Sequence, residues 1–215
     1  MYDEYAPRAI DMGYHVHPIS PPGFKPDKTP VLRALSGKFI KYRGWATDKV
    51  SVRTPQPGAG IGIRCGDNGV IAIDCDADDA APAISRALSP SPVYKVGQRG
   101  GTGFYRADFE VPSENFYDSA GRLVVQILST GRQTVVPPSI HPIKNEPYYW
   151  ANGRSVYDTP VGDVPLLPRD YRERILKLGY GPKEKRPPRP ERIDPETGEI
   201  ENGGAVRTPN SIPLH

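Results

Sequence analysis

The chain has 215 residues, enough for one elaborate domain or two small ones with a full hydrophobic core. Its 28 Lys and Arg and 25 Asp and Glu give a formal net charge of only +3, which excludes a histone-like basic protein but is compatible with a polyanionic partner. Two cysteines are too few for a disulfide framework, and no apolar run approaches the roughly 20 residues that cross a bilayer, so we expect a reduced, soluble protein of the cytoplasm with no membrane partner.

The N-terminal region predicts a helix, a strand and a proline-rich loop. The helix is expected over Tyr2–Met12, ended by Gly13 in a capping position, and a short strand follows over Tyr14–Ile19. Five prolines between positions 18 and 30 then impose an extended loop, which carries Lys25 and Lys28.

The next region predicts a second helix and a hairpin. The helix is expected over Val31–Tyr42. Strands over Ile61–Arg64 and Val70–Asp76 are joined by Gly-Asp-Asn-Gly at positions 66–69. Because this junction has the chemistry of a hairpin turn, we expect the two strands to pair.

The rest of the folded region mixes strands and helices without strict alternation. Asp78 or Asp79 can cap a helix that runs to about Leu88, and a final amphipathic helix is expected over Asp170–Leu178. Further strands are expected over Val93–Val96, Gly103–Ala107, Leu123–Leu128 and Thr134–Val136. This order predicts an α+β fold rather than a doubly wound parallel sheet.

The composition changes near Gly181. From there on, prolines, glycines and charges dominate and large apolar residues are scarce. Such a segment cannot bury enough surface to offset its ordering entropy. We therefore expect one folded domain over residues 1–180 and a disordered tail or linker over residues 181–215.

The most informative stretch is Val70–Asp76, an apolar run that ends in two acids one residue apart. Because side chains alternate along a strand, Asp74 and Asp76 share one face while Ile71 and Ile73 share the other. Like charges side by side favour a cation between them, which points to a divalent metal site. The alternative is a strand whose last acids simply enter solvent.

A glycine-rich segment over Lys95–Arg106 is the second candidate. Glycines let a backbone approach an anion closely, and Lys95, Arg99 and Arg106 offer cationic donors suited to phosphate oxygens. The alternative is a glycine-rich hairpin with solvated charges. The segment lacks the Gly-Lys-Ser/Thr ending of a P-loop, so it does not support ATP hydrolysis of that kind.

The third candidate runs from Gln126 to Pro142 and is followed by a Tyr-Tyr-Trp cluster. It predicts a hairpin and a rigid, proline-bounded loop that presents Ser139 and His141, with Arg132 on the strand beside the loop. These side chains can hold a nucleotide. The alternative is a structural loop whose aromatic neighbours belong to the core.

Together and in this order, the three segments resemble the N-terminal primase-polymerase domain of phage and plasmid replication proteins, a branch of the archaeo-eukaryotic primase superfamily. The resemblance runs from about Tyr5 to Trp150. It is carried by Asp-Cys-Asp at 74–76, Gly-Gln-Arg-Gly-Gly-Thr-Gly-Phe-Tyr-Arg at 97–106 and Gly-Arg-Gln-Thr-Val-Val-Pro-Pro-Ser-Ile-His-Pro at 131–142. It implies an RRM-like antiparallel sheet with flanking helices, in a phage- or plasmid-encoded protein of a bacterial or archaeal host cell.

The activity that the resemblance implies is template-directed nucleotidyl transfer, as a DNA primase or polymerase on single-stranded DNA, with two divalent ions, Mg²⁺ or Mn²⁺. Asp74 and Asp76 would bridge the ions. The NTP or dNTP would be bound by Lys95, Arg99, Arg106, Arg132, Ser139 and His141. A helicase domain or protein is the expected partner, and the tail after residue 181 would suit a tether to it.

Two positions depart from the family pattern. The superfamily commonly places a histidine in the second motif, where this chain has Thr102 and Gly103, and a nearby arginine can substitute. The third motif usually supplies a carboxylate at the position of Gln126, and a neutral amide is a weaker ligand for a hard ion. Either another acid fills in, Asp78 and Asp79 being nearest in sequence, or the domain is a slow or degenerate enzyme.

Two other functions fit the same residues. One is a catalytically degenerate nucleic-acid or nucleotide-binding module on the same scaffold. The other is a metal-dependent nuclease that uses the paired acids. The length of a labelled strand discriminates among the three functions. A polymerase lengthens the strand, a binding module leaves its length unchanged, and a nuclease shortens it.

Overall fold

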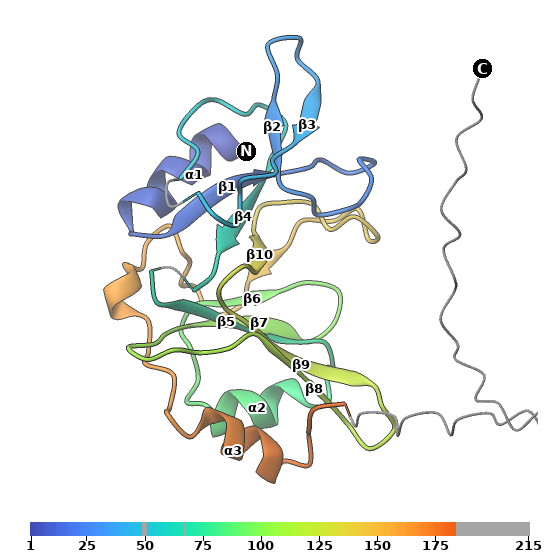
Figure 1. Cartoon of the computed structure of the whole chain (residues 1–215), viewed down its shortest axis with the longest axis vertical. Coiled ribbons are helices and arrows are strands. Elements are labelled where there is room, and N and C mark those ends of the chain that lie inside the picture. Colours follow the sequence, from blue (N-terminus) through green and yellow to red (C-terminus); the bar gives the residue numbers. More distant parts are fainter. Residues whose placement is uncertain (49–50, 67, 184–215) are drawn as a thin grey trace, which may run out of the picture. The chain divides into compact units, whose positions relative to one another are not determined.

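The computed structural model describes residues 1–48, 51–66 and 68–183. Met1–Lys183 form one compact unit, whose named strands all pair antiparallel and are flanked by helices (Figure 1). The predicted α+β fold is confirmed. The predicted tail over residues 181–215 lies outside the described residues except for its first three.

A three-stranded sheet combines two strands from the first part of the chain with one from the second half, in the order β1-β4-β10. Its strands are β1 (His15–Ile19), β4 (Gly60–Arg64) and β10 (Gln133–Val136). Helix α1 (Tyr2–Asp11) matches the helix predicted there, and its buried Ala6 and Ala9 share a core with residues of β1 and β4.

A six-stranded sheet carries most of the remaining chain, in the order β11-β6-β7-β5-β9-β8. Its strands are β5 (Val70–Cys75), β6 (Tyr94–Val96), β7 (Gly101–Arg106), β8 (Glu114–Tyr117), β9 (Leu123–Leu128) and β11 (Tyr149–Trp150). Helices α2 (Ala81–Ala87) and α3 (Tyr171–Lys177), the latter preceded by the short helix η1 (Val161–Asp163), lie together against one face (Figure 1).

Strand β5 shows the predicted alternation. Ile71 and Ile73 are 2% exposed and pack with Ile84 of α2 and Ile175 of α3. Each such aliphatic side chain contributes about 1.5–3 kcal/mol by leaving water. This burial holds the apolar face of β5 against the helices, so Asp74 projects from the opposite face.

Residues 31–42 form a hairpin, so the helix predicted there is wrong. Strand β2 (Val31–Arg33) pairs with β3 (Phe39–Lys41) through a turn in which Gly37 has φ +81°. A left-handed residue of this kind breaks a helix at that point. The apolar residues between positions 31 and 40 have a spacing compatible with a helix. The turn at Gly37 instead makes this segment a hairpin.

Strands β4 and β5 do not pair, so the predicted hairpin is also wrong. Both long edges of β4 are bonded to β1 and β10, and both edges of β5 are bonded to β7 and β9. The glycines between the strands do form a tight turn, since the N–H of Gly66 donates to the carbonyl of Val70 at 2.8 Å. The turn therefore connects strands of two different sheets and does not join two paired strands.

The acids before α2 do not cap that helix. Its N-cap residue is Ala80, and no side chain caps the helix. None of the helices in the described part of the chain is long and apolar enough to span a membrane.

Candidate active site

A row of polar side chains crosses the six-stranded sheet on the face opposite α2 and α3. Lys95 of β6 lies opposite Thr102 of β7, and Thr102 in turn lies opposite Asp74 of β5. On the other side of Asp74 stands Gln126 of β9. Because opposed residues of antiparallel strands project to the same face, strand register alone gathers these four side chains.

The carboxylate of Asp74 is oriented by its neighbour in this row. The hydroxyl of Thr102 donates a hydrogen bond to Oδ1 of Asp74. Thr102 is completely buried, whereas Asp74 is half-buried and keeps access to the cleft. Thr102, at the motif where a histidine was expected, therefore holds the first acid in place.

Both acids of the predicted metal site line one open cleft. Asp76 follows β5 directly and is exposed at the cleft's rim. Burial and the neighbouring charge of Asp74 raise the pKa of Asp76 above its ordinary value. The two carboxylates thus repel each other, and a divalent cation between them would relieve that repulsion.

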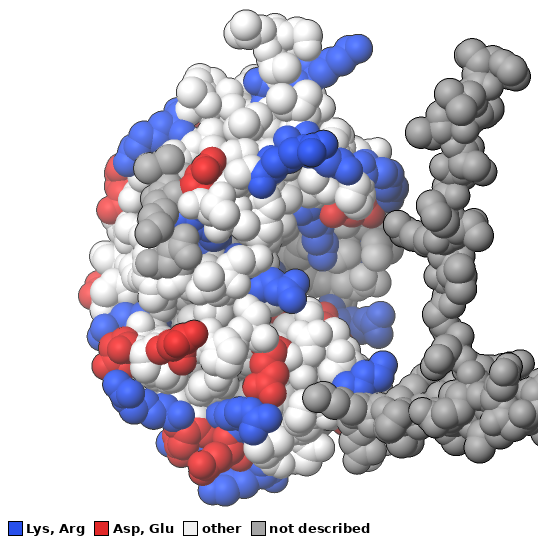
Figure 2. All heavy atoms as spheres, in the orientation of Figure 1, with Lys and Arg blue, Asp and Glu red and all other residues white. Residues whose placement is uncertain are grey.

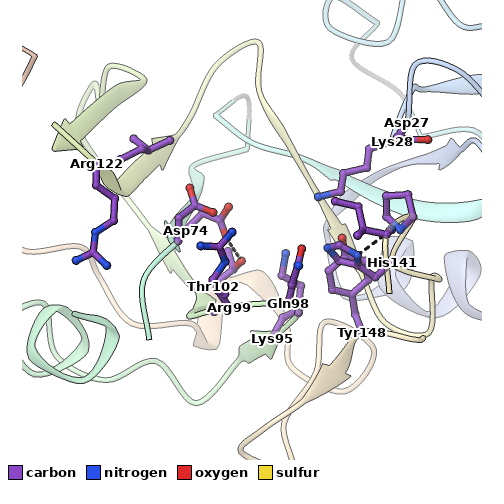
Figure 3. Close-up of a pocket in the computed structure, with 16 residues that line it drawn as sticks. Asp27, Lys28, Asp74, Lys95, Gln98, Arg99, Thr102, Arg122, His141 and Tyr148 are labelled. Carbon is purple, nitrogen blue, oxygen red and sulfur yellow. Dashed lines mark hydrogen bonds between the residues drawn. The ribbon is translucent and has the colours of Figure 1, made fainter. Parts of the chain in front are cut away.

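Basic and aromatic side chains surround the acids. Those labelled in Figure 3 include Lys28, Lys95, Arg99, His141 and Tyr148. They come from separate loops and strands, yet converge on one hollow. An anionic ligand that enters this cleft would meet fixed positive charge on several sides.

The glycine-rich segment packs against the end of β5. Gly100 has φ +55°, and a Cβ there would collide with the carbonyl oxygen of Cys75. Its N–H donates to Oδ1 of Asp78 at 2.5 Å. Glycine is thus needed for contact with the protein's own backbone, and the neighbouring Arg99, which is exposed, lines the same cleft as Asp74 (Figure 3).

Neither Asp78 nor Asp79 is among the residues that line the cleft. Asp78 is engaged with the backbone of Gly100, and Asp79 forms an ion pair with Arg122 at 3.1 Å. The structure therefore offers no support for either acid as a replacement for the missing third carboxylate.

Lys95 supplies a buried positive group beside the acids. Its side chain is 6% exposed, and its Nζ donates to Oγ1 of Thr134 at 2.9 Å. The same Nζ lies 5.1 Å from the centre of the Tyr148 ring, within the range of a cation–π contact. Burial lowers the pKa of Lys95.

Lys28 is a cleft residue to which the sequence assigned no role. Its side chain lies 5.9 Å from the centre of the Tyr148 ring, and its backbone has φ +55°. The carbonyl of Lys28 accepts a hydrogen bond of 2.9 Å from Nε2 of Gln133. Lys25, from the same loop, instead pairs with Asp27 at 2.8 Å and is 74% exposed.

His141 lines the cleft, and its hydrogen bonds define which ring nitrogen carries the proton. Its Nδ1 accepts hydrogen bonds from the backbone N–H groups of Ile143 and Lys144, at 3.2 and 3.3 Å. Burial and nearby lysines lower the pKa of His141, which favours the neutral ring. Because Nδ1 is an acceptor, the proton of that neutral ring is on Nε2.

Two residues predicted to contact the nucleotide, Ser139 and Arg106, form hydrogen bonds with the protein backbone. Ser139 is 2% exposed, and its hydroxyl accepts a hydrogen bond of 2.8 Å from the N–H of Ile61 in β4. Nε of Arg106 donates to the carbonyl of Val164 at 3.1 Å, and Arg106 does not line the cleft. Both side chains fix the scaffold around the site.

A second hollow continues from the same polar row toward β10. It is shared by Asp74 and Lys95 and is lined further by Gln126, Arg132 and Trp45. Nε2 of Gln126 donates to Oδ1 of Asn115 at 3.2 Å. Arg132 and Gln126 therefore share this hollow with Asp74, whereas Arg99 lines only the first cleft.

In the ranges that the structure describes, no group of three or more His, Cys, Asp or Glu side chains is placed to hold a metal ion. An ion shared by Asp74 and Asp76 would complete its coordination with water and with phosphate oxygens of a substrate. Such a mixed set is typical of Mg²⁺ at phosphoryl-transfer sites, so the residues present fit this ion.

A family model described as "Bifunctional DNA primase/polymerase, N-terminal" matches residues 6–168. The matched range includes the acidic pair, the glycine-rich segment and the loop that carries His141. A search of curated proteins finds no match.

Proposed function

The chain belongs to the bifunctional DNA primase/polymerase N-terminal family, and from this premise we propose that it transfers nucleotides onto a primer along a single-stranded DNA template. Family membership indicates the class of enzyme, a nucleotidyl transferase of DNA replication. The observation that carries the finer proposal is the placement of Asp74 and Asp76 together at the end of β5, in a cleft lined by cations.

The acids are proposed to hold divalent ions, Mg²⁺ or Mn²⁺. Bound there, two ions would lower the pKa of an attacking 3′-hydroxyl and neutralise the triphosphate and the leaving pyrophosphate. Thr102 supports this role because its hydroxyl fixes one oxygen of Asp74. The fixed geometry reduces the reorganisation that metal binding needs.

The triphosphate of an NTP or dNTP is proposed to lie among the cleft's cations. Lys28, Lys95 and Arg99 line the same hollow as the acids, so their charges can neutralise phosphate oxygens that face the ions. His141 offers its Nε2–H as a neutral donor. Arg132, in the adjoining hollow, is placed to meet the template or the primer end.

A binding module without turnover is the second candidate. It is favoured by Gln126, which stands beside Asp74 where the family resemblance leads one to expect a third carboxylate. With only two acids, an ion would be bound less tightly and its loss would leave nucleotide binding to the cations alone. A helicase domain or protein is a proposed partner of either form.

Primer extension tests the proposal. Purified protein is incubated with a primed template, labelled nucleotides and Mn²⁺, and the product lengths are measured. We expect extension that is lost in Asp74→Asn and Asp76→Asn, while Asp108→Asn, an exposed acid paired with Arg169, retains it. Circular dichroism checks that each variant folds.

The other outcomes are equally informative. Full activity in either cleft variant would remove the metal assignment. Template and nucleotide binding without extension would favour the binding module, and shortening of the end-labelled strand would indicate a nuclease.

A further inference from the structure

The β2–β3 hairpin extends from the rim of the cleft. Its two strands form a sheet of their own, which projects beyond α1 and the three-stranded sheet (Figure 1). Lys28, before β2, lines the cleft, and Trp45, after β3, lines the adjoining second hollow. The hairpin is therefore anchored to the candidate active site at both of its ends.

This segment concentrates the chain's positive charge. Residues 28–47 contain five Lys or Arg and no Asp or Glu. Taking these five from the chain's 28 Lys and Arg leaves 23 against 25 acids, so the net positive charge of the whole chain resides in this one segment. A local field of this kind attracts a polyanion even when the protein as a whole is nearly neutral.

The charges on the hairpin face solvent. Lys38, Lys41 and Arg43 are exposed, and none of the ion pairs between described residues involves them. Figure 2 shows blue and white atoms, and no red ones, on the projecting end. Arg33 differs, because its guanidinium donates to the carbonyl of Pro57 and lies 5.4 Å from the Phe39 ring centre.

Exposed aliphatic side chains accompany the charges. Leu35, in the turn, is fully exposed, and Ile40 is 52% exposed and pairs with Leu32 across the two strands. Apolar side chains among phosphate-binding cations are typical of surfaces that contact nucleotide sugars and bases.

We propose that the β2–β3 hairpin binds the phosphodiester backbone of the single-stranded DNA template beside the cleft. Lys38, Lys41 and Arg43 each contact a phosphate, and the hairpin guides the strand toward the acids between Lys28 and Trp45. The inference rests on the proposed function, because that function supplies the template. It adds a surface outside the nucleotide site and a reason for the chain's uneven charge.

Salt-dependent binding of oligo(dT) tests this surface. The triple variant Lys38→Gln, Lys41→Gln and Arg43→Gln is compared with the unaltered chain by fluorescence anisotropy at several salt concentrations. Each lost contact to single-stranded DNA removes about 0.7 from the slope of log affinity against log salt, so we expect the slope to fall by about 2. The affinity at low salt should fall by about tenfold or more.

A matched control removes the same charge elsewhere. Arg86, Arg154 and Lys177 are exposed and none of them lines the cleft. Their triple exchange to Gln should leave the slope nearly unchanged. An equal slope in the hairpin variant and the control would overturn the inference, and thermal unfolding shows that both variants are folded.

Two further measurements separate this inference from the proposed function. Binding of a nucleoside triphosphate with Mn²⁺ but no template should be unchanged in the hairpin variant. If the unaltered chain binds DNA through the hairpin but never extends a primer, the inference stands and the catalytic proposal fails. Equal hairpin-dependent binding of polyglutamate would overturn the inference in favour of an acidic protein partner.

Discussion

Gln126 of β9 lies directly opposite Asp74 of β5, in the same row of the six-stranded sheet. Its Nε2 donates to Asn115 on the next strand, at 3.2 Å, so the amide is held within the row. An amide at this place leaves Asp74 as the only acid of the row, with Asp76 just beyond the end of β5. The number of acids in the row, rather than its geometry, then limits how tightly an ion is bound.

Gln126→Asp should strengthen Mn²⁺ binding by about tenfold, because it adds an oxygen ligand and a negative charge beside Asp74. Isothermal titration or Mn²⁺ electron paramagnetic resonance measures the affinity. Asn115→Asp is the control, since it adds the same charge one strand farther out. An equal gain in both variants would show that general charge, and not this position, attracts the ion.

Lys28→Gln should raise the KM for nucleotides several-fold with a smaller effect on kcat, because Lys28 lines the cleft and offers charge to a bound triphosphate. Lys25→Gln is the matched control, since Lys25 comes from the same loop, is 74% exposed and does not line the cleft. Steady-state kinetics at fixed template concentration provides the comparison. Equal KM values for the two variants would remove Lys28 from the nucleotide site.

Ser139→Ala should destabilise the fold by about 1–3 kcal/mol, because it leaves the buried N–H of Ile61 without its acceptor. Ser36→Ala, in the exposed hairpin turn, should change the free energy of unfolding by less than about 0.5 kcal/mol. Urea unfolding measures both. A raised KM for nucleotides in folded Ser139→Ala, with unchanged stability, would return Ser139 to the ligand site.

His17 should make the fold sensitive to mild acid. Burial lowers its pKa to about 4 from an ordinary value near 6.5, and its Nε2–H donates to Oε1 of Gln133. The unfolded chain therefore binds more protons than the folded chain between these values, and stability is lost as the pH falls from about 6.5 toward 4. The full loss from this one group is about 3 kcal/mol.

The variant His17→Gln isolates this effect, because it removes the titrating ring and keeps a hydrogen-bonding side chain. Unfolding free energies at pH 7.5 and pH 5 should differ less in the variant than in the unaltered chain. The same difference in both proteins would show that other groups cause the acid sensitivity.

The sequence predicted the part of the site that depends on local alternation. The strand over Val70–Cys75 and the face from which Asp74 projects follow from period two and from a run of buried aliphatic side chains. The strand at Leu123–Leu128 was predicted with the same bounds, which placed Gln126 correctly. Short, strongly patterned strands carry this information within a few residues.

Long-range pairing could not be read in the same way. The turn at 66–69 has hairpin chemistry, yet its strands enter different sheets because each finds two other partners. Ser139 and Arg106 were predicted to contact a nucleotide. In the structure the Ser139 hydroxyl accepts from the N–H of Ile61, and Nε of Arg106 donates to the carbonyl of Val164, both far away in sequence. The backbone of Lys28 is bonded to Gln133, more than 100 residues farther along the chain. No local sequence pattern predicts this contact.

The most direct test of the central claim is diffraction from crystals soaked with Mn²⁺ and a non-hydrolysable nucleoside triphosphate. We predict anomalous density within coordinating distance of carboxylate oxygens of both Asp74 and Asp76, with phosphate oxygens on the side of Lys28, Lys95 and Arg99. Carboxylates that bind only neighbouring guanidinium or lysine groups, with no ion between them, would contradict it.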